Sequence, residues 1–390
     1  MKKVKVNIPS SLNFPHPHIL KSKIIEIDEG IEKGEEVLII NKENKIIGTG
    51  FYNPSSYKTL RIHTYKEFKE LSYQEIEKRI EESFLKRLNY FEKDESFRVV
   101  FSESDFLTGL IIDKFSNGFV FQINSVGMER KREFIVKAIK NLFDPLFIFE
   151  KSDGAIRKEE GLENFKKLHY GKLENPYLIF TEGLNFLIDI ENGQKTGFFL
   201  DQKINRLKLK KYAKGKVCLD LFSYTGAFTV HFLKEDCEKV FVVEISEKAL
   251  NLLKENVLIN NLSLKKVTLI HGDVFEKLKE IKKLKMGFDL IINDPPSFTH
   301  KKSKKERALN AYKNLHSDIF EIMNKKGICA TFSCTQAVEI NDLIENVINL
   351  QKNKNFIIYI KDFLFQSPCH PISLYFPESF YLKGLVLQKE

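Results

Sequence analysis

The sequence predicts an α/β fold whose C-terminal half is a doubly wound parallel sheet. From Lys216 onward, short apolar runs alternate with segments of helical spacing, a pattern typical of parallel strands that helices cover on both faces. The predicted strands are Lys216–Phe222, Lys239–Ile245, Val267–Asp273, Phe288–Asp294 and Gly327–Cys334, with helices near 225–235, 246–261, 274–283, 308–325 and 337–351. Two late strands, Phe356–Asp362 and Tyr381–Gln388, are expected to close the edge.

A second observation is length: 390 residues exceed one ordinary core, so two or three domains are expected. Residues 1–67 contain short β-segments at 37–40, 46–51 and 59–62, separated by turns, which predict a small β-domain. The helical spacing of apolar residues in 72–91 predicts a connecting helix. A second module is predicted in 68–186, before a C-terminal domain in 187–390. Its expected elements are strands at Phe97–Phe101, Leu110–Asp113, Phe119–Ile123 and Leu146–Glu150, a helix near Glu129–Leu142, and a hairpin at Tyr177–Phe180 and Phe186–Ile190.

Composition narrows the class of protein. Five cysteines form no CxxC pair, so neither a disulfide framework nor a zinc site is indicated, and no metal is expected. No apolar run reaches the roughly 18–20 residues that span a bilayer, so we expect a cytoplasmic protein without a membrane partner. A net charge of +9 and a pI near 9.0 fit a polyanionic partner, although lysines on solvated helix faces explain the charge equally well.

Polar residues interrupt the C-terminal strands where each strand ends. They are Asp220, Glu244, Asp273, Asp294 and Cys334. The carboxyl ends of the strands are where open α/β sheets bind ligands. A single acid there would most often be a helix cap or a surface turn, but four acids and a thiol at one edge indicate a binding site.

The first turn, from Asp220 to Phe228, lacks the G-x-G-x-x-G that a dinucleotide pyrophosphate requires, which argues against NAD. One glycine, Gly226, at a helix start suits a smaller ligand, and the helix N-terminus can receive the carboxylate of S-adenosylmethionine (SAM). Glu244 is expected to bind the ribose hydroxyls and Asp273 the adenine amine. Further cofactor contacts are expected from Phe222, Ser223, Ile245, Val274 and Asp294.

Cys334 is a candidate covalent nucleophile that acts opposite Asp294. The 5-carbon of a pyrimidine needs activation before it can accept a methyl group, and thiolate addition at the 6-carbon supplies it. A thiol of pKa ~8.5 is only roughly 3% ionised at pH 7, so a lowered pKa and good alignment are both needed. The rigid Pro295–Pro296 turn is expected to form a wall for the base, while Asp294 bonds its edge. A lone cysteine is more often a small buried hydrophobe, and Cys218 and Cys329 are interpreted so.

A basic run follows this turn and is expected to hold RNA phosphates, although alone it would be a solvated loop. It comprises Lys301, Lys302, Lys304, Lys305 and Arg307. A base that reaches Cys334 must leave any stack, which favours unassembled or locally single-stranded RNA as the substrate.

Several segments resemble the RlmI-like class I ribosomal RNA large-subunit methyltransferases, which make 5-methylcytosine, over nearly the whole chain. The matching segments are 50–56, 109–113, 193–202, 219–228, 294–298, 332–334 and 376–385. The resemblance implies an N-terminal PUA RNA-binding domain, a central β-β-α-β-β module and a Rossmann-like SAM-dependent methyltransferase domain. It implies Cys334 as nucleophile and Asp294 as the acid at the base. It also implies cofactor contacts from the segment that contains Thr196, Phe199, Asp201 and Gln202.

Two departures from related enzymes accompany the resemblance. RNA cytosine methyltransferases with two cysteines carry the second after the Asp-x-Pro turn, where this chain has Pro296 and Ser297, so the base that removes the 5-proton is unassigned. The segment from Phe14 to His18 also departs from the more usual His-Pro-Trp.

Three alternatives stay open from the residues. A uracil-5 methyltransferase would use the same thiol, a methyltransferase for a ring nitrogen or amine would need none, and an RNA-binding assembly factor would have a vestigial pocket. The target nucleotide, the assembly state of the RNA and a homodimer are likewise not specified by the sequence.

Overall fold

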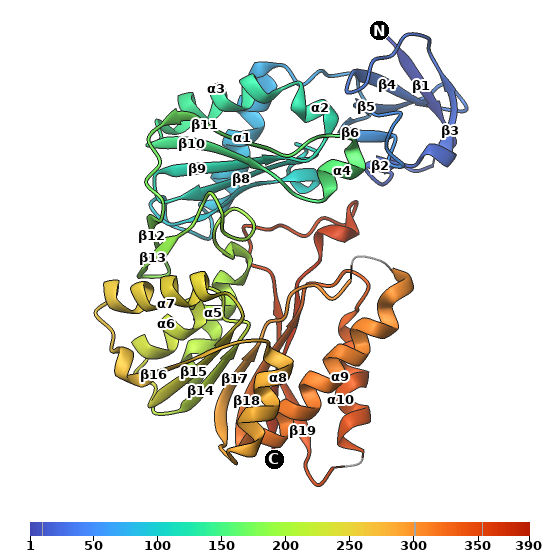
Figure 1. The fold of residues 1–390 in the computed structure, drawn as a ribbon. Helices are drawn as coiled ribbons and strands as arrows, with labels where there is room; N and C mark the ends of the chain where they lie inside the picture. The colour runs from blue at the N-terminus through green and yellow to red at the C-terminus, as the bar shows by residue number, and fades with distance from the viewer. Residues whose placement is uncertain (10, 300–301, 353) are drawn as a thin grey trace. The chain divides into compact units, whose positions relative to one another are not determined.

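The computed structural model describes residues 1–9, 11–299, 302–352 and 354–390 and divides the chain into two compact units. Unit 1 comprises Met1–Thr181, Asp189–Leu200 and Pro368–Ser379, and unit 2 comprises Glu182–Ile188, Asp201–Ser367 and Phe380–Glu390. The ribbon in Figure 1 follows both units from the N-terminus in blue to the C-terminus in red.

Unit 1 begins with a six-stranded sheet in the order β2-β6-β5-β4-β1-β3. Its apolar side chains form a separate small core, which includes Val4, Val37 and Ile62. The predicted β-segments near 37, 46 and 59 are confirmed, whereas the first three strands were not predicted. The strands are β1 (Lys3–Val6), β2 (His18–Ile19), β3 (Ile24–Ile27), β4 (Glu36–Asn41), β5 (Ile46–Tyr52) and β6 (Leu60–Tyr65).

The rest of unit 1 is built around a five-stranded sheet in the order β11-β10-β9-β8-β7, with helices α1 and α3 packed against each other. Every predicted element of this region is present, and β11 and two short helices are additional. The elements are α1 (Tyr73–Arg87), β7 (Phe97–Phe101), β8 (Leu110–Phe115), β9 (Gly118–Ile123), α2 (Val126–Glu129), α3 (Arg132–Phe143), β10 (Phe147–Ser152), α4 (Ile156–Glu160) and β11 (Phe165–Gly171). The predicted hairpin is β12 (Tyr177–Thr181) with β13 (Leu184–Ile188).

Unit 2 contains a seven-stranded sheet in the order β16-β15-β14-β17-β18-β20-β19. The first five strands run parallel, and β20 is antiparallel to both of its neighbours. The predicted parallel sheet with two closing strands is therefore confirmed. The strands are β14 (Val217–Leu221), β15 (Lys239–Glu244), β16 (Val267–His271), β17 (Phe288–Asn293), β18 (Met323–Ser333), β19 (Ile358–Phe365) and β20 (Lys383–Lys389).

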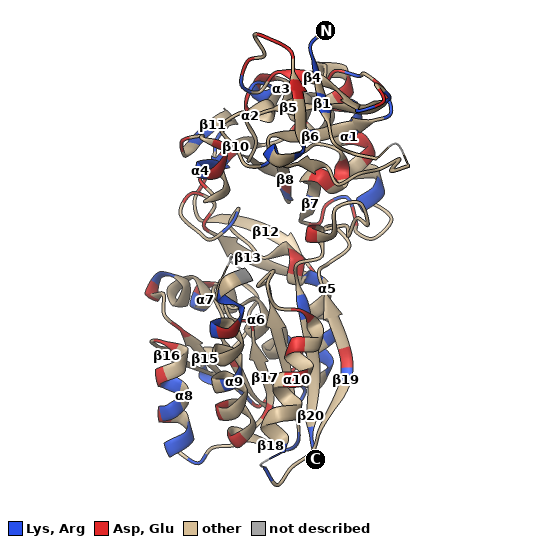
Figure 2. Cartoon of the chain, turned by 90° about the vertical axis from the view of Figure 1, so that its right-hand side faces the viewer, with Lys and Arg blue, Asp and Glu red and all other residues tan. Residues whose placement is uncertain are grey.

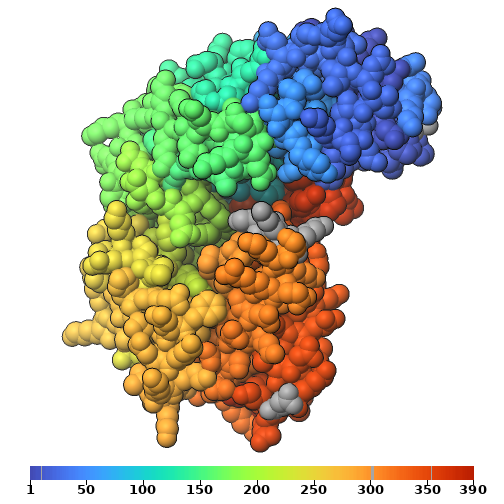
Figure 3. Space-filling model, turned by 45° about the vertical axis from the view of Figure 1, so that its right-hand side comes forward, coloured from blue at the N-terminus to red at the C-terminus, as the bar shows by residue number. Residues whose placement is uncertain are grey.

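Helices cover both faces of this sheet: α5, α6 and α7 on one side, and α8, α9 and α10 on the other (Figure 1). The second group shares one apolar core with the strands, in which Leu278, Tyr312 and Leu343 are buried. In Figure 2, strands β17 and β18 contain few charged residues, whereas charged residues occupy much of the length of α8. The helices are α5 (Lys203–Leu209), α6 (Ala227–Lys234), α7 (Glu247–Ile259), α8 (Val274–Lys283), α9 (Lys305–Ile322) and α10 (Ile340–Gln351). In the space-filling view of Figure 3, yellow and orange residues of this unit form much of its visible surface.

Candidate active site

The five polar residues predicted at the strand ends all lie at the carboxyl edge of the unit 2 sheet. Asp220 is the penultimate residue of β14 and Glu244 is the last of β15. Asp294 and Cys334 directly follow β17 and β18, and Asp273 caps α8 two residues after β16. Because these strands are adjacent and parallel, their ends share one edge.

The turn from β14 to α6 contains two buried oxygens without a hydrogen-bond partner among the described residues. Asp220 is 1% exposed, and its Oδ2 accepts from Thr229 Oγ1 at 2.7 Å, while its Oδ1 has no such partner. The Ser223 hydroxyl has none either. Buried polar groups are seldom left unsatisfied, so these two oxygens mark a place for a polar ligand.

Two residues of this turn have left-handed backbone conformations although neither is glycine: Phe222 with φ 59° and Tyr224 with φ 49°. Glu244 fixes the turn, because its Oε2 accepts from Tyr224 N at 2.9 Å and its Oε1 from Ser246 N at 2.8 Å. Strained backbone of this kind concentrates at binding sites, where the surrounding structure holds it in place.

Negative charge accumulates at this edge. Burial raises the pKa of Asp220 to about 7, and the charges of Asp294 and Glu244 add to the effect. A cationic ligand would relieve this repulsion. The adjacent turn is different in character: Asp273 Oδ1 accepts from Phe275 N at 2.9 Å, Val274 is buried, and Ile245 is 65% exposed. An exposed isoleucine beside a helix cap offers an apolar surface to a flat ring.

The loops that carry Asp294 and Cys334 are tied together through Thr335. The Thr335 Oγ1 lies 3.4 Å from Ser297 Oγ and accepts from Phe298 N at 3.3 Å. Beneath them, Asn293 Nδ2 donates to Thr331 Oγ1 at 3.0 Å across the β17–β18 pair. The structure thus brings the predicted acid and thiol into neighbouring loops. Cys334 is half-buried, whereas Cys329 inside β18 is fully buried.

Gln202 connects this pair to α5. Its Nε2 donates to Asp294 Oδ2 at 3.0 Å, and its Oε1 accepts from Asn205 Nδ2 at 2.7 Å. Asp201 is engaged elsewhere in unit 2, since Tyr381 Oη donates to its Oδ2 at 2.6 Å. The sequence analysis did not predict Asn205 as a site residue. The one available signal was its position three residues after Gln202, which is about one turn of a helix.

Thr196 and Phe199 belong to unit 1. The Thr196 hydroxyl donates to Asp113 Oδ2 at 2.6 Å, and Lys195 Nζ lies 4.4 Å from the centre of the Phe199 ring. Both residues therefore have partners within their own unit.

The basic run is partly described. Lys304 and Arg307 are exposed, and Lys305 Nζ forms an ion pair with Asp342 Oδ2 at 2.7 Å. Lys301 lies outside the described residues, and so does the side chain of Lys302. In the preceding turn, Pro295 is buried and Pro296 is exposed.

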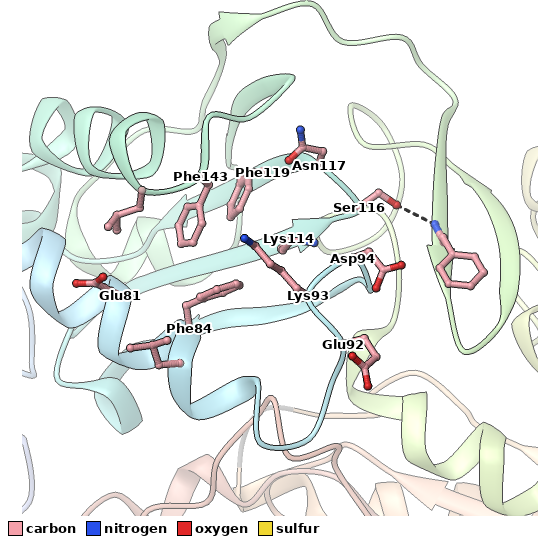
Figure 4. Close-up of a pocket in the computed structure, with 13 residues that line it drawn as sticks. Glu81, Phe84, Glu92, Lys93, Asp94, Lys114, Ser116, Asn117, Phe119 and Phe143 are labelled. Carbon is pink, nitrogen blue, oxygen red and sulfur yellow. Dashed lines mark hydrogen bonds between the residues drawn. The ribbon is translucent and has the colours of Figure 1, made fainter.

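Unit 1 has a pocket of its own, of about 820 Å³, which Figure 4 shows. Its floor is aromatic, because the rings of Phe119 and Phe143 stack at 4.6 Å and Phe84 meets Phe143 edge-on. Three acids and two lysines also line it, and Ser116 Oγ accepts from Phe180 N at 2.8 Å; the charged residues are Glu81, Glu92, Asp94, Lys93 and Lys114. No thiol lines it, in contrast to the edge of the unit 2 sheet.

Comparison with known proteins identifies the family. Residues 166–358 match the S-adenosylmethionine-dependent methyltransferase model, and 10–65 match a PUA-like domain. The chain is 35% identical to the ribosomal RNA large subunit methyltransferase I of Klebsiella pneumoniae over 382 residues, 96% of this chain and 94% of that protein. The protein of the same name from Pseudoalteromonas translucida is 35% identical over 379 residues, 96% of each chain.

The chain belongs to the ribosomal RNA large subunit methyltransferase I family. It is a SAM-dependent methyltransferase, and SAM is its cofactor. Two solved structures share the fold over their full length. One is a methyltransferase complexed with SAH (TM-score 0.84, 20% identity), and the other is a SAM-dependent methyltransferase from Streptococcus mutans (TM-score 0.82, 20% identity).

The cofactor of this family fits the residues at the sheet edge. The unpartnered oxygens of Asp220 and Ser223 are available to its polar groups, and the carboxylates are complementary to a sulfonium cation. The predicted family, fold class and cofactor are thus confirmed. Among the described residues, no helix is both long and apolar enough to cross a membrane.

Proposed function

We propose that this protein methylates the 5-carbon of a cytosine in large-subunit ribosomal RNA, with Cys334 as the covalent nucleophile. The observation that carries the proposal is the pairing of Asp294 and Cys334 at the ends of adjacent strands, in loops joined through Thr335. Its relatives are named for ribosomal RNA, and a PUA-like domain precedes the methyltransferase domain. Action on ribosomal RNA would place the protein in the cytoplasm.

In this reaction the Cys334 thiolate adds to the 6-carbon of the base, and the electron pair of the 5,6-double bond moves to make the 5-carbon nucleophilic. The 5-carbon would then bond to the methyl group that SAM supplies, and the bond between that methyl group and the sulfonium sulfur would break to leave a neutral thioether. A base then removes the 5-proton, and the carbon–sulfur bond breaks to return the thiolate. Asp294 holds the ring edge, and the Pro295–Pro296 wall orients the plane of the base.

The same proposal assigns roles at the cofactor. Glu244 accepts from the ribose hydroxyls, Asp273 from the adenine amine, and Val274 and Ile245 cover the adenine ring. The N-terminus of α6, which begins after Gly226, receives the methionine carboxylate. Phe222 and Ser223 line the first turn, and Asp220 faces the positive end of the cofactor. Asp201, Gln202 and Asp294 complete the proposed cofactor contacts.

Exposed Lys304 and Arg307 are proposed to bind phosphates of single-stranded RNA together with Lys301, Lys302 and Lys305. We also propose the division into three domains, 1–67, 68–186 and 187–390. Its boundaries differ from those of the two compact units, because Asp189–Leu200 and Pro368–Ser379 belong to unit 1.

The test is methyl transfer from labelled SAM to protein-free large-subunit RNA, followed by nucleoside mass spectrometry. We expect labelled 5-methylcytidine with the wild-type chain and none with Cys334→Ala, which should still bind SAM in calorimetry. The matched control is Cys329→Ala, a thiol buried inside the same strand, which should stay active. Labelled 5-methyluridine would show that the target base is uracil and not cytosine. An active Cys334→Ala would refute the covalent mechanism.

A further inference from the structure

Lys383 is a buried cation beside the strand that ends at Cys334. It begins β20, is 2% exposed and lies opposite Ser333 in the antiparallel β18–β20 ladder. Long charged side chains are almost never fully buried without a partner of opposite charge, because desolvating the ammonium is costly. The burial of Lys383 without an acidic partner therefore indicates a specific role for this side chain.

The ammonium of Lys383 holds the turn that follows Cys334. Its Nζ donates to Val338 O at 2.8 Å and to Thr335 O at 3.3 Å. Thr335 is the residue after Cys334 and also the link to the Asp294 loop. These two carbonyls satisfy donors of the ammonium but leave its charge uncompensated, since both are neutral.

No described carboxylate lies within ion-pair distance of Lys383 Nζ. The carboxylates whose charges act on the pKa of Lys383 are Glu339 and Asp342 at the start of α10, and both already have hydrogen-bond partners in that helix. Asp342 forms an ion pair with Lys305 at 2.7 Å, and each caps a backbone amide of that helix. Burial lowers the pKa of Lys383, and the charges of Glu339, Cys334 and Asp342 oppose this shift.

Two other groups near Cys334, Tyr312 and Asp294, affect the charge on its sulfur. Tyr312 of α9 is buried, and burial together with the charges of Cys334 and Asp294 raises the pKa of its phenol. Asp294 is itself an anion in the neighbouring loop. Tyr312 therefore stays a neutral phenol, whereas the Asp294 carboxylate opposes a negative charge on the sulfur. A cation close by offsets this opposition, and Lys383 supplies one.

We propose that Lys383 is a positioning residue that keeps the Cys334 sulfur ionised before RNA binds and fixes the turn that carries it. The proposal rests on the proposed role of Cys334 as nucleophile. In the resting enzyme the thiol proton leaves to water and the ammonium stays protonated, so the pair has no net charge. The negative charge of the thiolate offsets part of the desolvation free energy that burial of the ammonium costs.

The test measures the rate at which iodoacetamide alkylates Cys334 in the full-length protein between pH 5.5 and 9.5. Reaction of the other cysteines is subtracted with Cys334→Ser. We expect Lys383→Met to raise the midpoint of the pH profile by about one unit or more, which lowers the rate roughly tenfold at pH values below both midpoints. Lys383→Arg, which keeps the charge, should restore most of the rate.

Lys389 provides a matched control on the same face of β20. Its Nζ also donates to two backbone carbonyls, Phe320 O at 2.6 Å and Met323 O at 2.7 Å, and burial lowers its pKa as well. Lys389→Met therefore removes a similar lysine from the same strand, remote from the Cys334 turn. It should leave the pH profile unchanged.

A wild-type profile in folded Lys383→Met would overturn the proposal. If that variant does not fold, thiolate absorbance at about 240 nm in the wild type, minus Cys334→Ser, still decides the question. A midpoint above about 7 would mean that the sulfur is mostly a neutral thiol at neutral pH, and it would exclude the ionised resting state. Methyl transfer by Cys334→Ala refutes the covalent function instead, since the thiol titration does not depend on activity.

Discussion

Replacing Gly226 with alanine tests how the first turn of the site is built. Gly226 has φ 78° and directly precedes α6. A Cβ at this position would lie 2.4 Å from Leu253 Cγ, an atom near the backbone of α7 that is held in the core. The substitution therefore meets two separate obstacles, one of backbone conformation and one of packing.

The two costs can be estimated separately. A non-glycine residue in the left-handed region costs about 1–2 kcal/mol, and overpacking a tight contact costs about 1–3 kcal/mol. Together they predict that Gly226→Ala lowers the free energy of unfolding by about 2–5 kcal/mol. Gly215 is the matched control in the same unit, because it has φ 64° but nothing within 4 Å of its Cβ position. Gly215→Ala should therefore cost only the conformational part.

Urea unfolding followed by far-ultraviolet circular dichroism measures both variants, and the chain contains no tryptophan to serve as a fluorescent probe. The double variant with Leu253→Ala isolates the packing term, since it removes the Cγ that a new Cβ would meet. In that background the cost of Gly226→Ala should fall to that of Gly215→Ala. Equal costs for Gly226→Ala and Gly215→Ala in the wild-type background would refute the reasoning.

Two further predictions concern pH, in addition to those for Cys334 and Lys383. Because the pKa of Asp220 is raised to about 7, the folded state keeps its proton while the unfolded state loses it near pH 4. Folding stability should therefore fall as pH rises from about 4 to 7, and Asp220→Asn, which can still accept from Thr229, should be free of this loss. Urea midpoints of both proteins at pH 5 and 8 check this, and a parallel pH dependence would contradict it. Burial lowers the pKa of His316 to about 4, while the ring contacts Thr331 Oγ1 at 2.9 Å and Asn346 Oδ1 at 3.1 Å. The unfolded state takes up a proton near pH 6.5 before the folded state does, so stability should be complete above pH 6.5 and decline toward pH 4. His316→Gln should flatten this acid limb in thermal unfolding, and an unchanged limb would assign it to other groups.

Much of unit 2 could be predicted because its strands are buried on both faces. A strand such as Lys239–Glu244 is then nearly all apolar, and its polar last residue stands out as a candidate for the site. The prediction for α7, 246–261, differs from the observed Glu247–Ile259 by only two residues at its end. Cys334 and Asp294 were found by the same signal, a polar residue at the end of an apolar run.

Elements with mixed patterns were missed for the converse reason. The strand β11, Phe165–Gly171, contains two lysines and has no buried side chain, and its antiparallel pairing with β10 defines it. The short helix α5, Lys203–Leu209, likewise has no long apolar period, since it buries Asn205 and Arg206 together with Leu209. Pairing and buried polar contacts of this kind are long-range, so no local pattern specifies them.

The sequence by itself determined the alternation of strands and helices in most of unit 2, the acids at the sheet edge and the distinctive position of Cys334, because all of these depend on local apolar periodicity. Only the tertiary structure decided that Thr335 joins the Cys334 and Asp294 loops and that Lys383, 49 residues after Cys334, lies buried against the same turn. In the sequence Lys383 is one lysine among many in a basic chain. It is buried because β20 pairs antiparallel with β18. This hydrogen-bonded pairing joins segments that are distant in the sequence.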